Sequence, residues 1–171
     1  MFELLVAGIV AGIATKYAGE QRWFEGVELL GVPLVAGIVY AVIVGGWLVV
    51  RGPGRSPAIV LWAALVVVAW VAAVRAGLAT AGASDLPSFL PSGRGAWALA
   101  GGIAGLVGAS IVAGAGAVLL PATRSLRAFA MVAAVGAVAG LSIAVTDEAW
   151  PLFIVWQGAV AGATGYVADE D

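Results

Sequence analysis

The sequence contains neither cysteine nor histidine, and only 11% of its 171 residues are charged. The absence of cysteine excludes disulfides and thiol nucleophiles, and the absence of both residues excludes the usual zinc sites and haem ligation by histidine or cysteine. A soluble domain usually has about a quarter of its residues charged. This chain is 63% hydrophobic with a mean hydropathy of +1.08, too much apolar surface for a soluble fold of its size to bury. The lipid bilayer is therefore the expected solvent and partner.

Basic residues are also scarce. Eight basic and ten acidic residues give a formal net charge of −2, and no extended basic tract occurs. Nucleic-acid binding depends on clustered positive charge that offsets the phosphates, so it is not expected here. No metal site and no cofactor are expected either.

Six apolar stretches recur along the chain, separated by polar residues. They cover about residues 2–17, 27–50, 58–80, 96–120, 126–145 and 149–167. A transmembrane helix needs roughly 20 predominantly apolar residues. We therefore expect an all-α integral membrane protein, a compact bundle of six transmembrane helices in a single domain over residues 1–171.

The first stretch is the shortest, and the number of spans depends on it. It crosses the membrane only if Thr15, Lys16 and Tyr17 continue it, with the Lys16 side chain reaching up to the headgroups. If it does not cross, five spans remain. A signal sequence is the other interpretation, but Glu3 stands where such a sequence carries positive charge.

The segment GEQRWFEGVELL, residues 19–30, has two interpretations. Trp23, Phe24, Val27 and Leu30 share one helical face, which predicts a short helix in the membrane interface. Alternatively, the segment extends the second span. Pro33 predicts that the second membrane helix begins near it, because proline is tolerated in the first turn of a helix.

The basic residues predict the orientation. Two short connectors hold the densest positive charge, at Arg51, Arg55, Arg124 and Arg127. Cytoplasmic loops carry an excess of lysine and arginine, so this side is expected to face the cytoplasm. Both termini of a cell-membrane protein would then be cytoplasmic.

Four stretches share a glycine motif with the spacing GxxxG: GIVAG, GGIAG, GAVAG and GAVAG. The glycines are Gly8, Gly12, Gly101, Gly105, Gly136, Gly140, Gly158 and Gly162. This spacing places two glycines on one helix face, which allows a second helix to approach closely. We expect spans one, four, five and six to pack together, and spans two and three to face lipid or a partner subunit. An inverted duplication of two three-helix halves would also repeat the motif, but convergent small-residue packing is favoured.

Few polar residues fall within the spans, and none of them supports catalysis. The candidates are Tyr40, Ser110, Gln157 and Thr164, together with Arg75, which lies close enough to the end of a span to reach the headgroups. No carboxylate falls mid-span, so a proton relay of the pump type is not expected. A serine nucleophile at Ser110 lacks a histidine or a membrane-embedded lysine as its base, so an enzyme is not expected.

Gln157 and Thr164 fall on one helical stripe, flanked by Gly158 and Gly165. Polar groups on such a face stabilise helix contacts, by about 0.6 kcal/mol on average in membrane proteins. The same arrangement suits a narrow site or path with a neutral lining. Both interpretations stay open at this point, and the first is the more common.

Three classes of function follow. The leading hypothesis is a channel or carrier for a small neutral solute that uses Ser110, Gln157, Thr164 and Tyr40. The second is a non-catalytic structural or assembly subunit of a membrane complex or homo-oligomer. The third is a holin-like protein that permeabilises the membrane. A carrier should be stabilised by its ligand, a permeabilising protein should arrest growth, and a subunit should co-purify with itself or a partner.

Overall fold

The computed structural model describes residues 2–22, 25–51, 57–82, 93–145 and 150–169. Six α-helices dominate them: α1 (Phe2–Glu20), α2 (Val35–Arg51), α3 (Ala58–Ala81), α4 (Arg94–Leu119), α5 (Leu126–Gly140) and α6 (Trp150–Asp169). Two 3₁₀ turns, η2 (Pro121–Arg124) and η3 (Leu141–Ala144), precede and follow α5. Two short strands, β1 (Glu28–Leu29) and β2 (Val32–Pro33), lie between α1 and α2.

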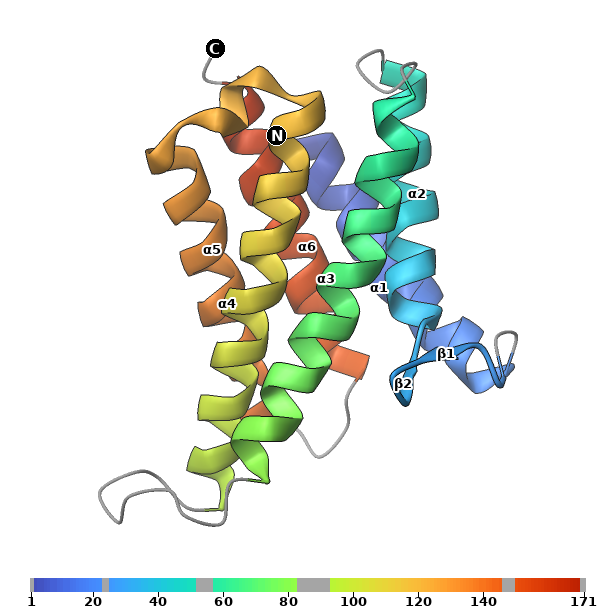
Figure 1. Ribbon diagram of the computed structural model, residues 1–171, viewed down its shortest axis with the longest axis vertical. Coiled ribbons are helices and arrows are strands. Elements are labelled where there is room, and N and C mark those ends of the chain that lie inside the picture. Colours follow the sequence, from blue (N-terminus) through green and yellow to red (C-terminus); the bar gives the residue numbers. More distant parts are fainter. Residues whose placement is uncertain (1, 23–24, 52–56, 83–92, 146–149, 170–171) are drawn as a thin grey trace.

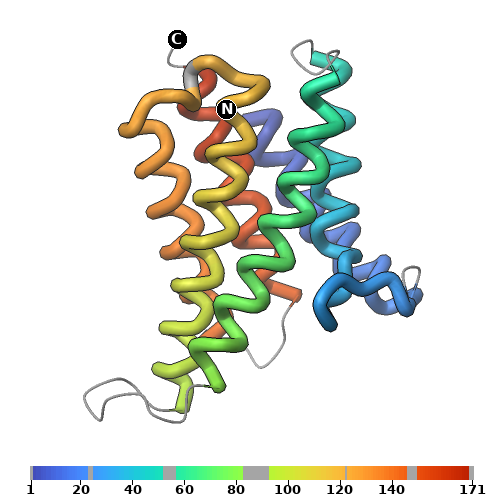
Figure 2. Tube along the Cα trace, in the orientation of Figure 1, coloured from blue at the N-terminus to red at the C-terminus, as the bar shows by residue number. Residues whose placement is uncertain are grey.

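The six helices form a closed ring in chain order. Each helix packs against the next, and α6 packs against α1. Successive helices run in opposite directions, so the start of α1 and the end of α6 lie at the same end of the bundle (Figure 1). We call this the terminal end, and the opposite end, which carries the two strands, the hairpin end. Figure 2 shows α3 and α4 in front of α1 and α6, with α2 and α5 at the two sides.

The lengths of the helices confirm a multi-spanning membrane protein. Within the described ranges, five helical segments are long and apolar enough to cross a bilayer, among them α1 with 19 residues and α5 with η3 as one 19-residue segment. Helix α1 continues through Lys16 to Glu20, as a crossing by the first stretch requires. Counted this way, the shortest of the apolar segments is α2, whose 17 residues are at the lower limit for a span.

The segment before α2 differs from both interpretations of the sequence. Helix α1 ends at Glu20, and β1 and β2 form an antiparallel hairpin in which Glu28 pairs with Pro33 and Leu29 with Val32. The two loop residues, Leu30 and Gly31, have φ of 53° and 71°, which is the geometry of a tight hairpin turn. The predicted interfacial helix is therefore wrong for the described part of residues 19–30, and so is an extension of the second span to residue 27.

The hairpin is held against the bundle. The buried Val32 faces inwards, and the Trp70 indole of α3 donates a hydrogen bond of 2.7 Å to the carbonyl oxygen of Pro33. Helix α2 then begins at Val35, close to Pro33 as predicted. The apolar spacing that suggested a helix ignores Gly26 and Gly31, both of which have positive φ and break a helix.

The eight glycines of the GxxxG segments lie in two helix contacts. A methyl group on Gly8 or Gly12 of α1 would overlap the backbone of α6, and a methyl group on Gly101 or Gly105 would overlap the backbone of α5. Gly136 and Gly140 face α4 in the same way, whereas Gly158 and Gly162 lie beneath Ile9 and Leu5 of α1. The backbones of α4 and α5 therefore approach each other directly, as do those of α1 and α6.

Helix α3 is packed more extensively than expected. Its contact with α4 is among the largest in the bundle, so it does not simply face lipid or a partner. Ala69 and Ala73 are buried, and a methyl group on Gly77 would lie 3.2 Å from the Cβ atom of Ala104. These three small residues recur at every fourth position. This is the same spacing of small residues as in GxxxG, with alanine in place of two of the glycines.

Candidate functional site

Gln157 lies in the middle of α6 and is almost completely buried, with 2% of its surface exposed. Its Nε2 donates a long hydrogen bond of 3.4 Å to Oγ1 of Thr15 on α1. Oγ1 of Thr15 in turn donates to the carbonyl oxygen of Ala11 at 2.8 Å. Because the only hydrogen of the Thr15 hydroxyl is used there, Thr15 can only accept from Gln157. The amide nitrogen of Gln157 therefore points to Thr15, and its oxygen points elsewhere.

Two polar atoms in this region are buried and have no hydrogen-bond partner in the described part of the chain. They are Oε1 of Gln157 and Nε1 of Trp156. The first is an acceptor and the second is a donor. A buried polar atom without a partner destabilises the fold by about 1–3 kcal/mol, and most such atoms in proteins find a partner. Oγ of Ser142 in η3 is a third such atom, away from Gln157 in sequence.

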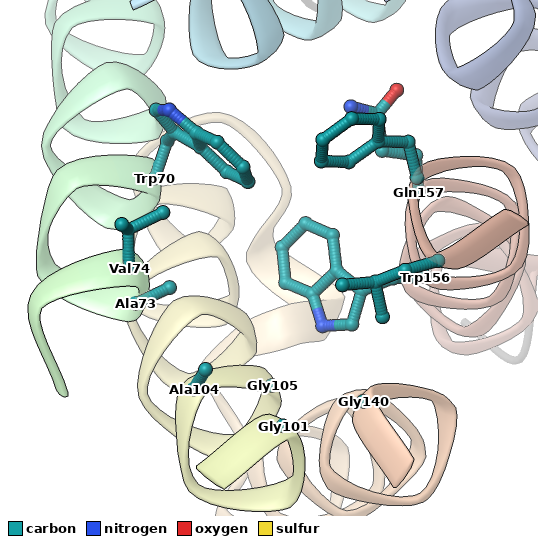
Figure 3. A pocket seen from close by; sticks show the side chains of 11 residues that line it. Trp70, Ala73, Val74, Gly101, Ala104, Gly105, Gly140, Trp156 and Gln157 are labelled. Atoms are coloured by element: carbon teal, nitrogen blue, oxygen red, sulfur yellow. The ribbon is translucent and has the colours of Figure 1, made fainter. Parts of the chain in front are cut away.

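A cavity of about 90 Å³ lies between α3, α4, α5 and α6, towards the hairpin end. Figure 3 shows Trp70 on one side of it, with Trp156 and Gln157 on the other. Gly101, Gly105 and Gly140 form part of its wall, where backbone replaces side chains. The remaining lining residues are Ala73, Val74, Ala104, Leu152 and Phe153, so the wall is apolar.

Two smaller cavities of about 10 Å³ each follow along the bundle towards the terminal end. Trp70, Trp156 and Gln157, which line the 90 Å³ cavity, also line the middle one, together with Tyr40 and Val112. Tyr40 and Val112 then line the third cavity, which ends among residues close to the terminal end: Leu4, Leu48, Leu120 and Thr164. The three cavities thus form a series through the interior of the ring, in which each shares residues with the next.

Aromatic side chains separate the cavities. The rings of Tyr40 and Trp156 lie with their centroids 6.4 Å apart, and those of Trp70 and Phe153 lie 5.5 Å apart edge to face. Tyr40 is buried, with 3% of its surface exposed. Tyr40, Trp70 and Trp156 each line two neighbouring cavities, so aromatic rings lie at both junctions of the series.

None of the residues that line the three cavities is charged. Among the described residues, ion pairs lie at both ends of the bundle. Arg51 of α2 pairs with Glu3 of α1 at 2.6 Å at the terminal end. Lys16 pairs with Glu20 at 3.6 Å at the hairpin end, and its ammonium lies 4.8 Å from the ring centroid of Trp150 on α6. Arg75 lies on the outer face of α3, which suits a side chain that reaches the headgroups.

The structure brings together three of the four polar residues that the sequence singled out. Gln157, Tyr40 and Thr164 line cavities of the series, whereas Ser110 lines none of the three. The hydroxyl of Thr164 donates to the carbonyl oxygen of Val160 in its own helix, at 2.8 Å, and so does not bond to another helix. Sequence reasoning missed Thr15 and Trp156 as site residues. The signal for Trp156 was its position mid-span, because tryptophan usually lies at the interfaces of the membrane.

Comparison of the chain with known protein families, with curated protein sequences and with solved structures finds no match.

Proposed function

We propose that this protein is a channel or carrier that passes a small neutral solute through the interior of its six-helix ring. The observation that carries the proposal is the series of three cavities that follow one another along the bundle, from the hairpin side towards the terminal end. Consecutive cavities share Trp156 and Gln157, or Tyr40 and Val112. Three of the polar residues expected to line a solute path lie along it.

The absence of charge in the lining supports a neutral solute. A buried ion is strongly unfavourable unless it is paired or coordinated. The residues that line the three cavities offer amide, hydroxyl and indole groups but no opposite charge. A neutral molecule with few polar groups meets no such barrier.

Narrow connections support passage that depends on side-chain motion. The 10 Å³ cavities have room for about one water molecule each. Tyr40 and Trp156 must therefore move aside for each molecule that passes. This favours slow, gated transport over a continuously open pore.

A flux measurement in proteoliposomes tests the proposal. Small neutral solutes such as urea, acetamide and glycerol are applied in a stopped-flow osmotic assay, and vesicle reswelling reports their uptake. Tyr40→Ala should increase the flux because it removes the ring that separates two cavities. Tyr17→Ala, the same change at a side chain 56% exposed outside the series, is the matched control and should leave the flux unchanged.

Two results would contradict the proposal. The first is uptake by loaded vesicles that equals uptake by empty vesicles for every solute, with Tyr40→Ala giving no increase. Co-purification with itself or a partner would then favour a structural subunit. The second is release of large solutes as fast as small ones, which would favour a permeabilising protein.

A further inference from the structure

The β1–β2 hairpin lies at a level of the bundle where side chains typical of a membrane interface gather. Trp150 of α6 lies against the Lys16 ammonium of α1 at this end, and tryptophan and lysine favour the interfacial layer. Arg75 follows Trp70 by five residues, about 8 Å further along the outer face of α3. Because Trp70 donates to the carbonyl oxygen of Pro33, the hairpin is held close to the depth at which Arg75 reaches the headgroups.

The length of α2 leaves room for the hairpin within the bilayer. Its 17 residues rise about 25 Å, whereas the hydrocarbon core is about 30 Å thick. Arg51 ends α2 at the terminal end, where it pairs with Glu3, and Val35 begins it directly after the hairpin (Figure 1). With Arg51 among the headgroups on one side, Val35 stops about 5 Å short of those on the other. The hairpin occupies that remaining depth.

The backbone at the base of the hairpin suits an apolar surrounding. A backbone N–H or C=O without a partner is costly in contact with acyl chains. Pro33 has no N–H, and its carbonyl oxygen accepts from Trp70 at 2.7 Å. The N–H of Leu34 donates to the carbonyl oxygen of Val27 at 3.1 Å, which continues the ladder beyond the two strands. These positions can therefore meet lipid with their polar groups paired.

The side chains of the hairpin divide by polarity. Val32 is buried against the bundle, and its cross-strand partner Leu29 points to the same face. Val27 shares this face because strand residues alternate, whereas the exposed Glu28 points to the opposite one. Leu29 and Val27 are 44% and 43% exposed, so the apolar face continues past the edge of the bundle.

Leu30 at the turn is both exposed and strained. Its φ of 53° lies in the left-handed region, which glycine, asparagine or aspartate ordinarily occupy in such a turn. Because 70% of its surface is exposed, packing within the chain does little to offset this strain. A strained conformation that persists points to a contact that compensates for it. Acyl chains supply such a contact, since a leucine side chain gains free energy on leaving water.

We infer that the hairpin inserts into the membrane interface and that lipid is its partner. Val27, Leu29 and Leu30 contact the acyl chains just below the headgroups, and Glu28 faces water. The hairpin thereby completes the short span of α2. Insertion does not depend on transport through the ring, so either can fail without the other.

Spin labelling of the full chain in phosphatidylcholine nanodiscs tests the insertion. The chain has no cysteine, so single cysteines at positions 27, 28, 29 and 30 each carry one nitroxide. Power saturation measures collisions of the nitroxide with oxygen, which concentrates among acyl chains, and with a nickel chelate, which stays in water. Glu28→Cys is the matched control on the same hairpin. Val42→Cys, at a side chain 67% exposed in the middle of α2, is the reference for lipid contact.

The oxygen-to-nickel collision ratio at positions 27, 29 and 30 should lie closer to that of Val42→Cys than to that of Glu28→Cys. A ratio like that of Glu28→Cys at all three positions would overturn the insertion. Low collision rates with both reagents at position 30 would overturn it as well, because they would show that a second copy or another protein covers the turn.

A second measurement avoids the label. The Leu30 methyl resonances of the otherwise unmodified chain, assigned by their loss in Leu30→Asn, are followed by NMR in the same nanodiscs. Phosphatidylcholine with a nitroxide on its acyl chain should broaden them, and a gadolinium chelate in water should not. Broadening by the chelate alone would overturn the insertion.

Discussion

The contact between α4 and α5 makes a sharp prediction for Gly105→Ala. The methyl group of an alanine at this position would overlap the carbonyl oxygen of Gly136, and would lie 2.9 Å from the Gly136 carbonyl carbon and 3.2 Å from the Gly140 Cα. All three are backbone atoms. No side chain can rotate away, so the two helices must separate to accommodate the methyl group.

The magnitude follows from the cost of overpacking. Extra atoms in a packed core typically destabilise a protein by about 1–3 kcal/mol. We expect the upper part of this range, about 2–3 kcal/mol, because the atoms in the way belong to backbone. For a chain of this size that loss corresponds to a decrease in Tm of about 4–12 °C.

The assay is thermal unfolding in one detergent, followed by circular dichroism. Gly114→Ala is the matched control, because Gly114 lies on the same helix and a methyl group there meets no atom within 4 Å. Its Tm should change little, since exposed substitutions usually stay within about 0.5 kcal/mol. If Gly105→Ala unfolds at the same temperature as Gly114→Ala, α4 and α5 do not approach as described, and the role assigned to these glycines is wrong.

Three further substitutions test other contacts. Gln157→Leu should leave Tm unchanged or raise it. The variant loses one weak hydrogen bond of about 0.6 kcal/mol, but it also removes an acceptor whose burial without a partner costs about 1–3 kcal/mol. A lower Tm would show that Oε1 has a hydrogen-bond partner in the folded protein. Glu3→Gln should lower the free energy of unfolding by less than about 1 kcal/mol, since both side chains of the pair with Arg51 are half exposed. A larger decrease in the free energy of unfolding, measured at high salt, would contradict this. A double-mutant cycle of Lys16→Met and Trp150→Leu should show a coupling free energy of about 0.5–1 kcal/mol. A coupling free energy of zero would show that the cation–π contact does not contribute to stability.

Much of the fold could be predicted from hydropathy and length alone. The observed bounds of α3, α4 and α6 lie within two residues of the predicted spans. This works because a bilayer demands continuous apolar helices, and polar residues must mark their ends. The prediction was weakest where the local pattern was ambiguous. Apolar residues around Val27 and Leu30 fit a helical face, but positive φ at Gly26 and Gly31 directs the chain into a hairpin.

The neighbours of each helix were harder to predict. The GxxxG segments indicated which helix faces approach closely, but the pairing of α1 with α6 and of α4 with α5 depends on the closure of the whole ring. Ala69, Ala73 and Gly77 show the limit of a motif search. The same spacing with alanine in place of glycine escaped it, and α3 was expected to face lipid or a partner subunit.

The candidate site was predicted in part, for a comparable reason. A glutamine in mid-membrane is conspicuous, so Gln157 could be found from its position in the sequence. Its partner Thr15 lies 142 positions away on a different helix, and no local pattern links them. Ser110 was predicted from depth alone, and depth does not determine which face of α4 meets the interior.

The central claim is that small neutral molecules reach the interior of the ring from water. The most direct test introduces single cysteines, which the chain otherwise lacks, at Gln157, Thr164 and Ser110. Iodoacetamide, itself a small neutral amide, is applied to intact cells and to inverted vesicles, and the rate of alkylation is measured. The account predicts reaction at positions 157 and 164, and far slower reaction at 110. Equal and negligible alkylation at all three positions, from both sides of the membrane, would contradict it.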